Sequence, residues 1–354
     1  MEFIESTISA IDKSAEESAV ITLEIPEDKK TQFNFVQGQF LTVQAEINGE
    51  HVRRSYSLCS SPIDNQFRIG IKKIPKGKFS SYACDSLEVG DTLSIAPPDG
   101  KFFIPLDENR DGTLVAFAAG SGITPILSII KTHLHKEANT KVKLFYTNKS
   151  VSTIMLKEEL EGLKNEFLDR FQLFYFLTQE KRNIDFFNGR MDTDKLDQIF
   201  KLHGEPINFD HYFICGPEKM IFDIKDYLNQ HEVKDEQIHF ELFGTEIPQE
   251  ELLTIEAESN GSNSKLTIIE GGKSMEIEAT QGKGNILDYA LNNSADLPYA
   301  CKGGVCCTCR AKLVQGEVKQ LRTFGLEQDE IDNNYILTCQ AIPLSEEIVV
   351  DFDQ

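Results

Sequence analysis

Eight cysteines occur in the 354-residue chain, and four of them crowd into one short stretch near its end. Three of these, with one cysteine about thirty residues later, follow the pattern C-x4-C-x2-C…C: Cys301, Cys306, Cys309 and Cys339. Two tetrahedral irons bridged by sulfide need two thiolates each, and one tight loop can supply three of them. Gly303 and Gly304 would let the loop wrap closely, with N–H groups pointing at the sulfurs. The spacing therefore predicts a [2Fe–2S] cluster.

Other interpretations are also compatible with these cysteines. Structural zinc accepts four thiolates, although zinc sites more often show paired C-x2-C units. A cluster with a purely structural role would leave the same motif. The surplus thiol, Cys307, could replace Cys306 as a ligand, but C-x5-C-x-C fits the [2Fe–2S] pattern less well. We therefore expect Cys307 to be a small residue packed beneath the loop.

A second group of chemically suited side chains lies at the end of a predicted strand: Arg54, Tyr56, Ser57 and Ser60. The Arg54 guanidinium can pair with a pyrophosphate, and the Tyr56 ring can stack on a flat ring system. The Ser57 hydroxyl can hydrogen-bond a ring nitrogen. These properties suit a flavin, although a strand with alternating exposed polar residues would show the same pattern.

Residues 77–80 have the pattern of a loop entering a short helix: Gly77, Lys78, Phe79 and Ser80. The N–H groups at a helix N-terminus are free to bind phosphate. Taken alone, this signal is weak.

Another loop joins a predicted strand to a helix and contains Gly120, Ser121, Gly122, Thr124 and Pro125. The backbone can approach a pyrophosphate closely at the two glycines. Pro125 stands where the full dinucleotide-binding fingerprint has its last glycine. A glycine-rich turn without a ligand is the alternative.

The last predicted parallel strand is followed by Gly216 and Pro217, and it ends at Cys215. The carboxyl edge of such a sheet is where ligands bind, so this thiol could touch a nicotinamide. A lone cysteine at a strand end is more often a packed residue.

Segments of three different patterns must position these groups, and the fold class is multidomain. Residues 1–108 carry short strand patterns with turns, which predicts an antiparallel β-barrel. Residues 109–244 predict an α/β domain with a parallel sheet. Residues 245–264 include a polar Gly/Ser/Asn run and are predicted to be a linker. Residues 265–354 form a third unit with two strand patterns, a helix and the cysteine loop.

Strand and helix patterns alternate four times in the second segment. The predicted strands are 114–118, 143–146, 171–177 and 212–215, and the predicted helices are 124–135, 153–166, 192–201 and 218–229.

Composition excludes some partners. The net charge of −21 argues against nucleic acid, because phosphate contacts need a basic surface. The first residues lack the basic and apolar regions of a signal peptide. The longest apolar stretch, residues 114–130, is interrupted by glycine, serine and proline, unlike a membrane span. We therefore expect a cytoplasmic protein that does not bind membranes.

In this order, the motifs around Arg54, Gly120 and Cys215, followed by Glu241, Leu242 and Phe243, resemble the ferredoxin–NADP reductase superfamily. The C-terminal cysteine segment resembles the ferredoxin domain fused to reductase components of bacterial oxygenases. Reductase subunits of phenylacetyl-CoA epoxidases and reductases of ketosteroid hydroxylases share this arrangement. The resemblance covers nearly the whole chain and implies a β-grasp (α+β) ferredoxin domain at residues 265–354.

The resemblance also implies a role for each matching residue. The FAD-binding set would be Arg54, Tyr56, Ser57, Ser60, Gly77, Lys78, Phe79 and Ser80. The nicotinamide-cofactor set would be Gly120, Ser121, Gly122, Thr124, Pro125, Gly216 and Pro217. Ser57, Cys215 and Glu241 would take part in catalysis, with Ser57 near the flavin N5. Phe243 would cover the flavin ring, although it is internal here and plant-type reductases often have a terminal tyrosine.

Electron counting connects these cofactors. NAD(P)H gives two electrons as a hydride, a [2Fe–2S] cluster takes one at a time, and a flavin can do both. The resemblance implies an oxygenase component as the acceptor, with di-iron epoxidase subunits as the first candidate. A reductase of a Rieske or ketosteroid-type hydroxylase, or a redox-sensing protein without turnover, is the alternative.

The choice between NADPH and NADH depends on the end of the second strand, which meets the adenosine ribose in a dinucleotide fold. NAD binders usually place an acid there, and residues 147–150 contain none. Lys149 could meet the charge of a 2′-phosphate, so NADPH is the favoured donor. Arg182 or Arg190 could also reach it. The alternative is that Lys149 is a solvated loop residue.

Overall fold

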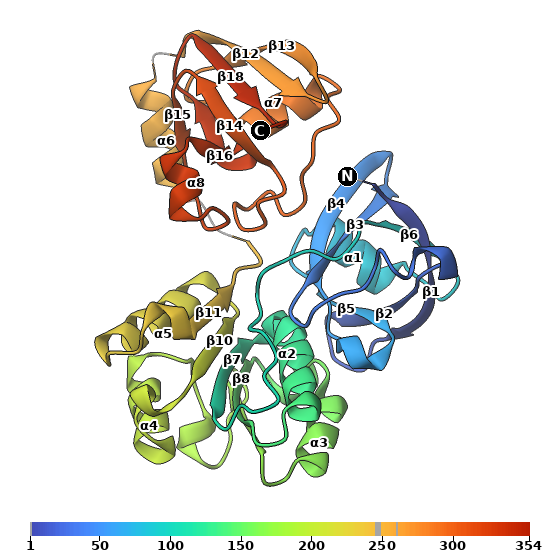
Figure 1. The fold of residues 1–354 in the computed structure, drawn as a ribbon, viewed down its shortest axis with the longest axis vertical. Helices are drawn as coiled ribbons and strands as arrows, with labels where there is room; N and C mark the ends of the chain where they lie inside the picture. The colour runs from blue at the N-terminus through green and yellow to red at the C-terminus, as the bar shows by residue number, and fades with distance from the viewer. Residues whose placement is uncertain (1, 245–248, 260) are drawn as a thin grey trace. The chain divides into compact units, whose positions relative to one another are not determined.

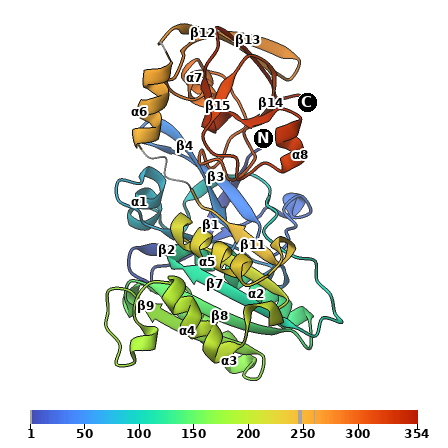
Figure 2. The same ribbon diagram turned by 90° about the vertical axis from the view of Figure 1, so that its left-hand side faces the viewer.

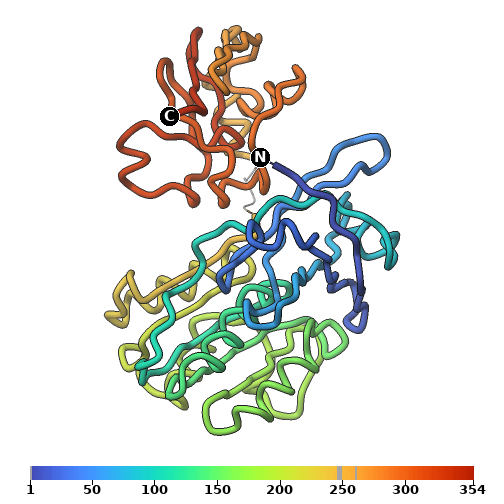
Figure 3. Tube along the Cα trace, turned by 45° about the vertical axis from the view of Figure 1, so that its right-hand side comes forward, coloured from blue at the N-terminus to red at the C-terminus, as the bar shows by residue number. Residues whose placement is uncertain are grey.

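The computed structural model describes residues 2–244, 249–259 and 261–354. The chain forms two compact units, Met1–Leu242 and Phe243–Gln354 (Figure 1). Figure 3 follows the backbone through the first unit and then into the second. Within the described ranges, no helix has the length and apolar character needed to cross a membrane.

The first unit begins with a six-stranded antiparallel sheet of order β4-β3-β6-β1-β2-β5. Its elements are β1 (Ile4–Asp12), β2 (Ser18–Glu24), β3 (Phe40–Ile47), β4 (Glu50–Ser57), η2 (Pro62–Asp64), β5 (Phe67–Lys72), α1 (Lys78–Asp85) and β6 (Thr92–Ile95). Leu58, just after β4, bridges Ile69 on β5, so the two edge strands meet. The buried side chains inside include Ile8, Ile21, Leu41, Val43, Ile69 and Leu93. The antiparallel sheet expected for residues 1–108 is confirmed.

A two-residue turn sets the register of β4, the strand that carries the flavin motif. Asn48 and Gly49 both have positive φ, 54° and 79°, as the tight turn of a hairpin requires. Ile47 therefore pairs with Glu50, and the register runs on to Phe40 opposite Ser57.

A parallel five-stranded sheet of order β11-β10-β7-β8-β9 follows. Its strands are β7 (Thr113–Ala119), β8 (Lys141–Asn148), β9 (Phe171–Leu177), β10 (His211–Cys215) and β11 (Ile238–Glu241). Its helices are α2 (Ile123–Lys136), α3 (Lys157–Glu166), α4 (Thr193–His203) and α5 (Glu218–Gln230). The chain winds from β7 towards β9 and then returns to the other side of β7. This reversal makes the carboxyl ends of β7 and β10 the place where such sheets bind ligands.

Helices cover both faces of the parallel sheet, as its continuous hydrophobic strands require. Figure 1 shows α2 and α3 on one face, and in Figure 2 α4 and α5 lie in front of the strands. The four predicted strands and four predicted helices correspond to β7 to β10 and α2 to α5. The helix predicted from residue 153 begins later, because a short 3-10 turn (Val151–Thr153) and a left-handed residue, Leu156, precede α3.

The second unit is a mixed sheet of order β13-β12-β18-β14-β16 with a two-stranded sheet beside it. Its elements are α6 (Gln249–Glu258), β12 (Asn263–Glu270), β13 (Lys273–Thr280), α7 (Ile286–Asn292), β14 (Arg310–Gln315), β15 (Val318–Gln320), α8 (Gln328–Asp332), β16 (Tyr335–Leu337), β17 (Ala341–Pro343) and β18 (Glu347–Asp351). The first strand, β12, pairs in parallel with the last, β18. Ile286, Leu287 and Ala290 of α7 are buried in the core of this unit.

The segment predicted as a linker, residues 245–264, differs from that expectation. Helix α6 lies within it, and β12 already begins at Asn263. Residues 245–248 and 260 fall outside the described part. The helix forms because its sequence is rich in Glu and Leu, which favour helices, and it buries Ile255. The domain boundaries at 108, 244 and 264 stay predictions.

Candidate functional site

The predicted flavin residues of β4 face the helix that follows β5. Arg54 and Tyr56 are both half-buried and, two residues apart, share one face of the strand. The Tyr56 ring packs on Phe79 of α1, with centroids 5.5 Å apart. Lys78 forms an ion pair with Glu50 at the start of β4. The strand motif and the residue 77–80 loop, separate in sequence, thus lie side by side, as one flavin nucleotide would need.

Gly77 shows why this loop needs a glycine. A Cβ there would collide with Ser80 Oγ and the Ile74 side chain. The Ser80 hydroxyl accepts a hydrogen bond from Ile74 N at 3.3 Å. The turn before α1 is therefore tight. Its role in binding flavin phosphate stays a prediction.

Ser57, buried at the end of β4, donates a hydrogen bond to Glu241 at the end of β11. The distance from Ser57 Oγ to Glu241 Oε2 is 2.8 Å, across 184 residues of sequence. Glu241 keeps part of its surface exposed, yet burial raises the pKa of its carboxyl to about 8, and the Ser57 hydrogen bond opposes this rise. At neutral pH Glu241 therefore holds a proton.

Cys215 lies directly beside Glu241 in the register of β10 and β11. Its side chain is fully buried, and burial raises the pKa of its thiol well above the ordinary value, with the Glu241 charge adding to the rise. The thiol is therefore not ionised. The structure brings all three predicted catalytic residues, Ser57, Cys215 and Glu241, to one place in the first unit.

The two glycine turns meet backbone to backbone. A Cβ on Gly122 would collide with the Cys215 carbonyl, and one on Gly216 would crowd Ala119. The turn after β7 can therefore lie this close to the end of β10 only with glycine at position 122, while glycine at 216 leaves room for Ala119 and Met220. They border the ligand crevice expected where the strand order reverses.

The Gly120 loop has two neighbours that the sequence motif did not reveal. Tyr146 Oη donates to Gly120 O at 2.9 Å. Lys72, the last residue of β5, has its Nζ 3.2 Å from the point where a Cβ on Gly120 would stand. Burial lowers the pKa of Lys72, with the Lys149 charge adding to the effect. Lys72 is thus a candidate phosphate contact, and in the sequence only its position at the end of a strand could have suggested it.

The surroundings of Lys149 are more acidic than the sequence indicated. Glu17 Oε2, from the turn between β1 and β2, lies 3.9 Å from Lys149 Nζ. Glu180 accepts a hydrogen bond from Val151 N at 2.8 Å and donates its own N–H to Lys149 O. Both acids are far from residues 147–150 in sequence, which is why inspection of that segment missed them.

Three further residues were predicted to contact a cofactor: Arg182, Arg190 and Phe243. Arg182 lies over the Phe187 ring at 5.5 Å, and Arg190 is exposed. Phe243 is 43% exposed and is the first residue of the second compact unit. Its predicted contact with a flavin ring stays a prediction.

The cysteine loop of the second unit forms two thiol pairs. The thiol of Cys301 lies beside that of Cys306, and the thiol of Cys309 lies beside that of Cys339. Pairing of β14 with β16 brings Cys339 to the loop, because Thr338 donates through both N and Oγ1 to Cys309 O. Across the described ranges, no three metal-binding side chains converge as they would around a single ion.

Backbone groups also point at the sulfurs. Gly303 N donates to Cys301 Sγ at 3.2 Å, and Cys301 N donates to Cys306 Sγ at 3.4 Å. Two thiol pairs with N–H donors fit a two-iron cluster, in which each iron takes two thiolates. Cys307 has a left-handed backbone, φ 52°, and its thiol contacts Gly325 O. The thiol therefore faces the segment around Gly325, and both its expected place beneath the loop and the ligand set stay predictions.

Comparison with known proteins agrees with this architecture. Models of an oxidoreductase FAD-binding domain, an oxidoreductase NAD-binding domain and a 2Fe-2S iron-sulfur cluster binding domain match residues 6–104, 117–226 and 268–344. One subunit of the 1,2-phenylacetyl-CoA epoxidase of Escherichia coli (strain K12) is 37% identical over 353 residues, covering 98% of this chain and 97% of the relative. The ferredoxin reductase component of a 3-ketosteroid-9-alpha-monooxygenase from Rhodococcus rhodochrous is 28% identical, covering 98% and 96%.

A solved structure shares the fold. Phthalate dioxygenase reductase superposes with a TM-score of 0.64 at 24% identity, covering 99% of this chain and 98% of its own. The expected FAD, nicotinamide and [2Fe–2S] domains are confirmed, as is an oxidoreductase. With its three domains in this order, the chain belongs to the family of flavin- and iron–sulfur-containing oxygenase reductases.

Proposed function

We propose that this protein carries electrons from NADPH, through FAD and a [2Fe–2S] cluster, to the di-iron subunits of a phenylacetyl-CoA epoxidase. The Ser57/Glu241 hydrogen bond beside Cys215 is the observation that carries the reductase part of the proposal. It joins a carboxyl of raised pKa at the end of β11 to the end of β4, the strand with the flavin motif, and this supports an acid at the proposed reaction site. The 37% identical relative supports the choice of partner.

The chain's own residues would bind, orient and protect the cofactors. FAD, when bound, supplies the exchange between two-electron and one-electron chemistry. Arg54 and the 77–80 turn would hold its phosphates, and Tyr56 would support its ring. Glu241 would hold a proton at its carboxyl, with Ser57 Oγ as the hydrogen-bonded link towards the ring edge.

On the nicotinamide side, the chain supplies close backbone turns and charge. The turns at Gly122 and Gly216 would let the cofactor approach the end of the sheet, while the buried Cys215 excludes water from beneath it. Lys72 would meet the pyrophosphate, and Lys149 a 2′-phosphate. The two thiol pairs of the second unit would each hold one iron. We place this work in the cytoplasm, where eight reduced cysteines are expected.

The test is reconstitution with purified di-iron epoxidase subunits, NADPH and phenylacetyl-CoA. We expect NADPH oxidation that depends on phenylacetyl-CoA and on both proteins. The oxygenase of a ketosteroid hydroxylase with its own substrate serves as the matched control. Faster coupled turnover with that control would contradict the proposed partner, whereas failure to reduce ferricyanide with either nicotinamide would contradict the reductase itself.

A further inference from the structure

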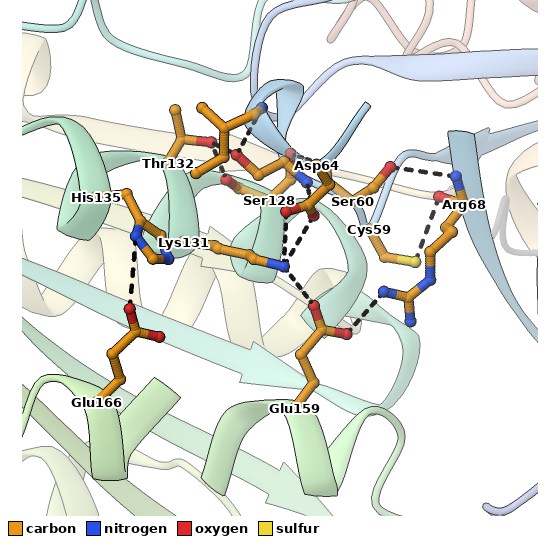
Figure 4. A network of polar contacts seen from close by, with 12 residues as sticks. Cys59, Ser60, Asp64, Arg68, Ser128, Lys131, Thr132, His135, Glu159 and Glu166 are labelled. Atoms are coloured by element: carbon orange, nitrogen blue, oxygen red, sulfur yellow. Dashed lines mark hydrogen bonds and ion pairs between the residues drawn. The ribbon is translucent and has the colours of Figure 1, made fainter. Parts of the chain in front are cut away.

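A chain of four alternating charges joins the flavin-binding sheet to the nicotinamide-binding sheet (Figure 4). Lys131 Nζ lies 2.8 Å from Asp64 Oδ1 and 3.0 Å from Glu159 Oε1. Glu159 Oε2 in turn lies 2.9 Å from Arg68 Nη1. Asp64 lies in the 3-10 turn η2 and Arg68 in the neighbouring sheet strand β5, whereas Lys131 and Glu159 belong to α2 and α3.

These pairs differ from ordinary surface salt bridges. Their side chains are only 15–21% exposed, and the two positive and two negative charges balance. Exposed pairs contribute little, because water screens them and long side chains lose freedom. In this chain of charges, the side chains are partly buried, so both the screening by water and the loss of freedom are smaller. Partly buried charges that lose one partner leave the other uncompensated.

Hydrogen bonds on the same face of α2 reinforce the contact. Ser128 Oγ donates to Ser60 O at 2.7 Å, and the hydroxyls of Ser61 and Thr132 lie 2.6 Å apart. One turn nearer the helix start, Thr124 packs so closely on Gly70 of β5 that a Cβ at that glycine would collide with it. Residues 124, 128, 131 and 132 share one helical face, so α2 is fixed along its length to the flavin-binding sheet.

Helix α2 also positions the nicotinamide loop, because it begins directly after Gly120–Gly122. On the other side, Ser60 follows the flavin residue Ser57 by three positions. The helix from Ile123 to Lys131 is a stiff rod of about 12 Å. A small rotation at Lys131 therefore moves the loop relative to the flavin residues. Hydride transfer needs the donating carbon of the nicotinamide and the accepting nitrogen of the flavin to lie about 3–3.5 Å apart. A shift of about 1 Å between them can lower the rate about a hundredfold.

We infer that Lys131, held between Asp64 and Glu159, is a positioning residue for hydride transfer. It fixes the nicotinamide-binding loop relative to the flavin-binding strand. This inference rests on the proposed NAD(P)H–flavin reaction but not on the identity of the oxygenase. It predicts that loss of the charge affects the rate within the bound complex more than it affects cofactor binding.

The experiment measures anaerobic flavin reduction by stopped flow, with both NADPH and NADH, in the full holoprotein. For Lys131→Met we expect the limiting rate to fall at least about tenfold while the apparent dissociation constant changes less than about threefold. Lys131→Arg should restore most of the rate. With a nicotinamide cofactor deuterated at C4, the isotope effect on flavin reduction in Lys131→Met should be no smaller than in the wild type, because hydride transfer is the step that is slowed.

The matched control is Lys157→Met, which removes a lysine from an exposed pair with Glu161 on α3. It should leave both constants unchanged. If Lys131→Met fails to fold, Glu159→Gln, which keeps the side-chain shape, carries the same expectation. An unchanged limiting rate in a folded variant, or a loss explained wholly by weaker cofactor binding, would overturn the inference. No flavin reduction by either nicotinamide in the wild type would instead contradict the proposed function.

Discussion

The two compact units build their sites in opposite ways. The iron–sulfur unit gathers three of its four proposed ligands within nine consecutive residues, and the fourth, Cys339, lies in the short turn that follows β16. The flavin–nicotinamide unit joins Ser57 to Glu241 across 184 residues. A locally encoded site should fail when one ligand is lost. A site assembled over long distances should fail when the backbone contacts that assemble it are disturbed.

The largest expected effect tests the local site. Serine at Cys301, Cys306, Cys309 or Cys339 should abolish the cluster, because one of the two irons would lose one of its two thiolates. The measurement is iron and acid-labile sulfide content with the visible spectrum. Cys307→Ser is the control and should retain about two irons and two sulfides per chain. Stoichiometric zinc without visible charge-transfer bands would contradict the ligand assignment.

The next effect tests assembly through the glycine turns. Gly122→Ala should slow hydride transfer by more than about a hundredfold, because the new Cβ pushes the two turns apart. Gly162→Ala, in α3, is the control, since a Cβ there meets open space. Stopped-flow flavin reduction measures both. Wild-type kinetics in Gly122→Ala would show that the contact between the turns is dispensable.

The third effect concerns the proton on Glu241. Its pKa of about 8, against an ordinary 4.5, means that the carboxyl is protonated below pH 8 and ionised above it. If the Glu241 carboxyl supplies a proton during the flavin reaction, turnover should fall as the pH rises through about 8, because the carboxyl loses that proton. Glu241→Gln should lower turnover about a hundredfold and remove this transition. The pH profile of ferricyanide reduction measures it. A profile that keeps the same transition in the variant would assign the proton to another group.

The smallest effect concerns cofactor choice. Lys149→Ala should lower the ratio of kcat/KM for NADPH to that for NADH about tenfold, since a charge-assisted contact contributes about 1.5–3 kcal/mol. Glu17→Gln should raise the ratio by no more than about threefold, because the Glu17/Lys149 pair is exposed. Steady-state kinetics with both cofactors decide this. A wild type that prefers NADH would contradict the assignment of Lys149.

The same contrast explains what could be predicted from the sequence. Periodic patterns identified four strands of the parallel sheet and the four helices that cover it, but not β11. Fixed spacing identified the cysteine loop. Both kinds of signal lie within short stretches. Helix α6 was missed because the adjacent Gly/Ser/Asn run dominated the interpretation of residues 245–264.

Contacts between distant residues could not be predicted. Glu17 approaches Lys149 only when the turn between β1 and β2 meets the loop after β8, and Glu180 reaches that loop from the segment after β9. Lys72 carries no motif, and the charge chain through Lys131 involves four elements. Each of these contacts depends on how the folded elements pack against one another, and a pattern within one short stretch of sequence cannot predict that packing.

The pairing of β12 with β18 has a consequence for biosynthesis. Because β18 lies between β12 and β14, the main sheet of the second unit has a gap at its centre until residues 347–351 have left the ribosome. The first unit needs nothing beyond Leu242 and can fold while the rest is still being translated. All four proposed ligand cysteines emerge before that last strand does. A cluster inserted during translation would therefore meet a domain whose thiols are already present but whose main sheet is still incomplete.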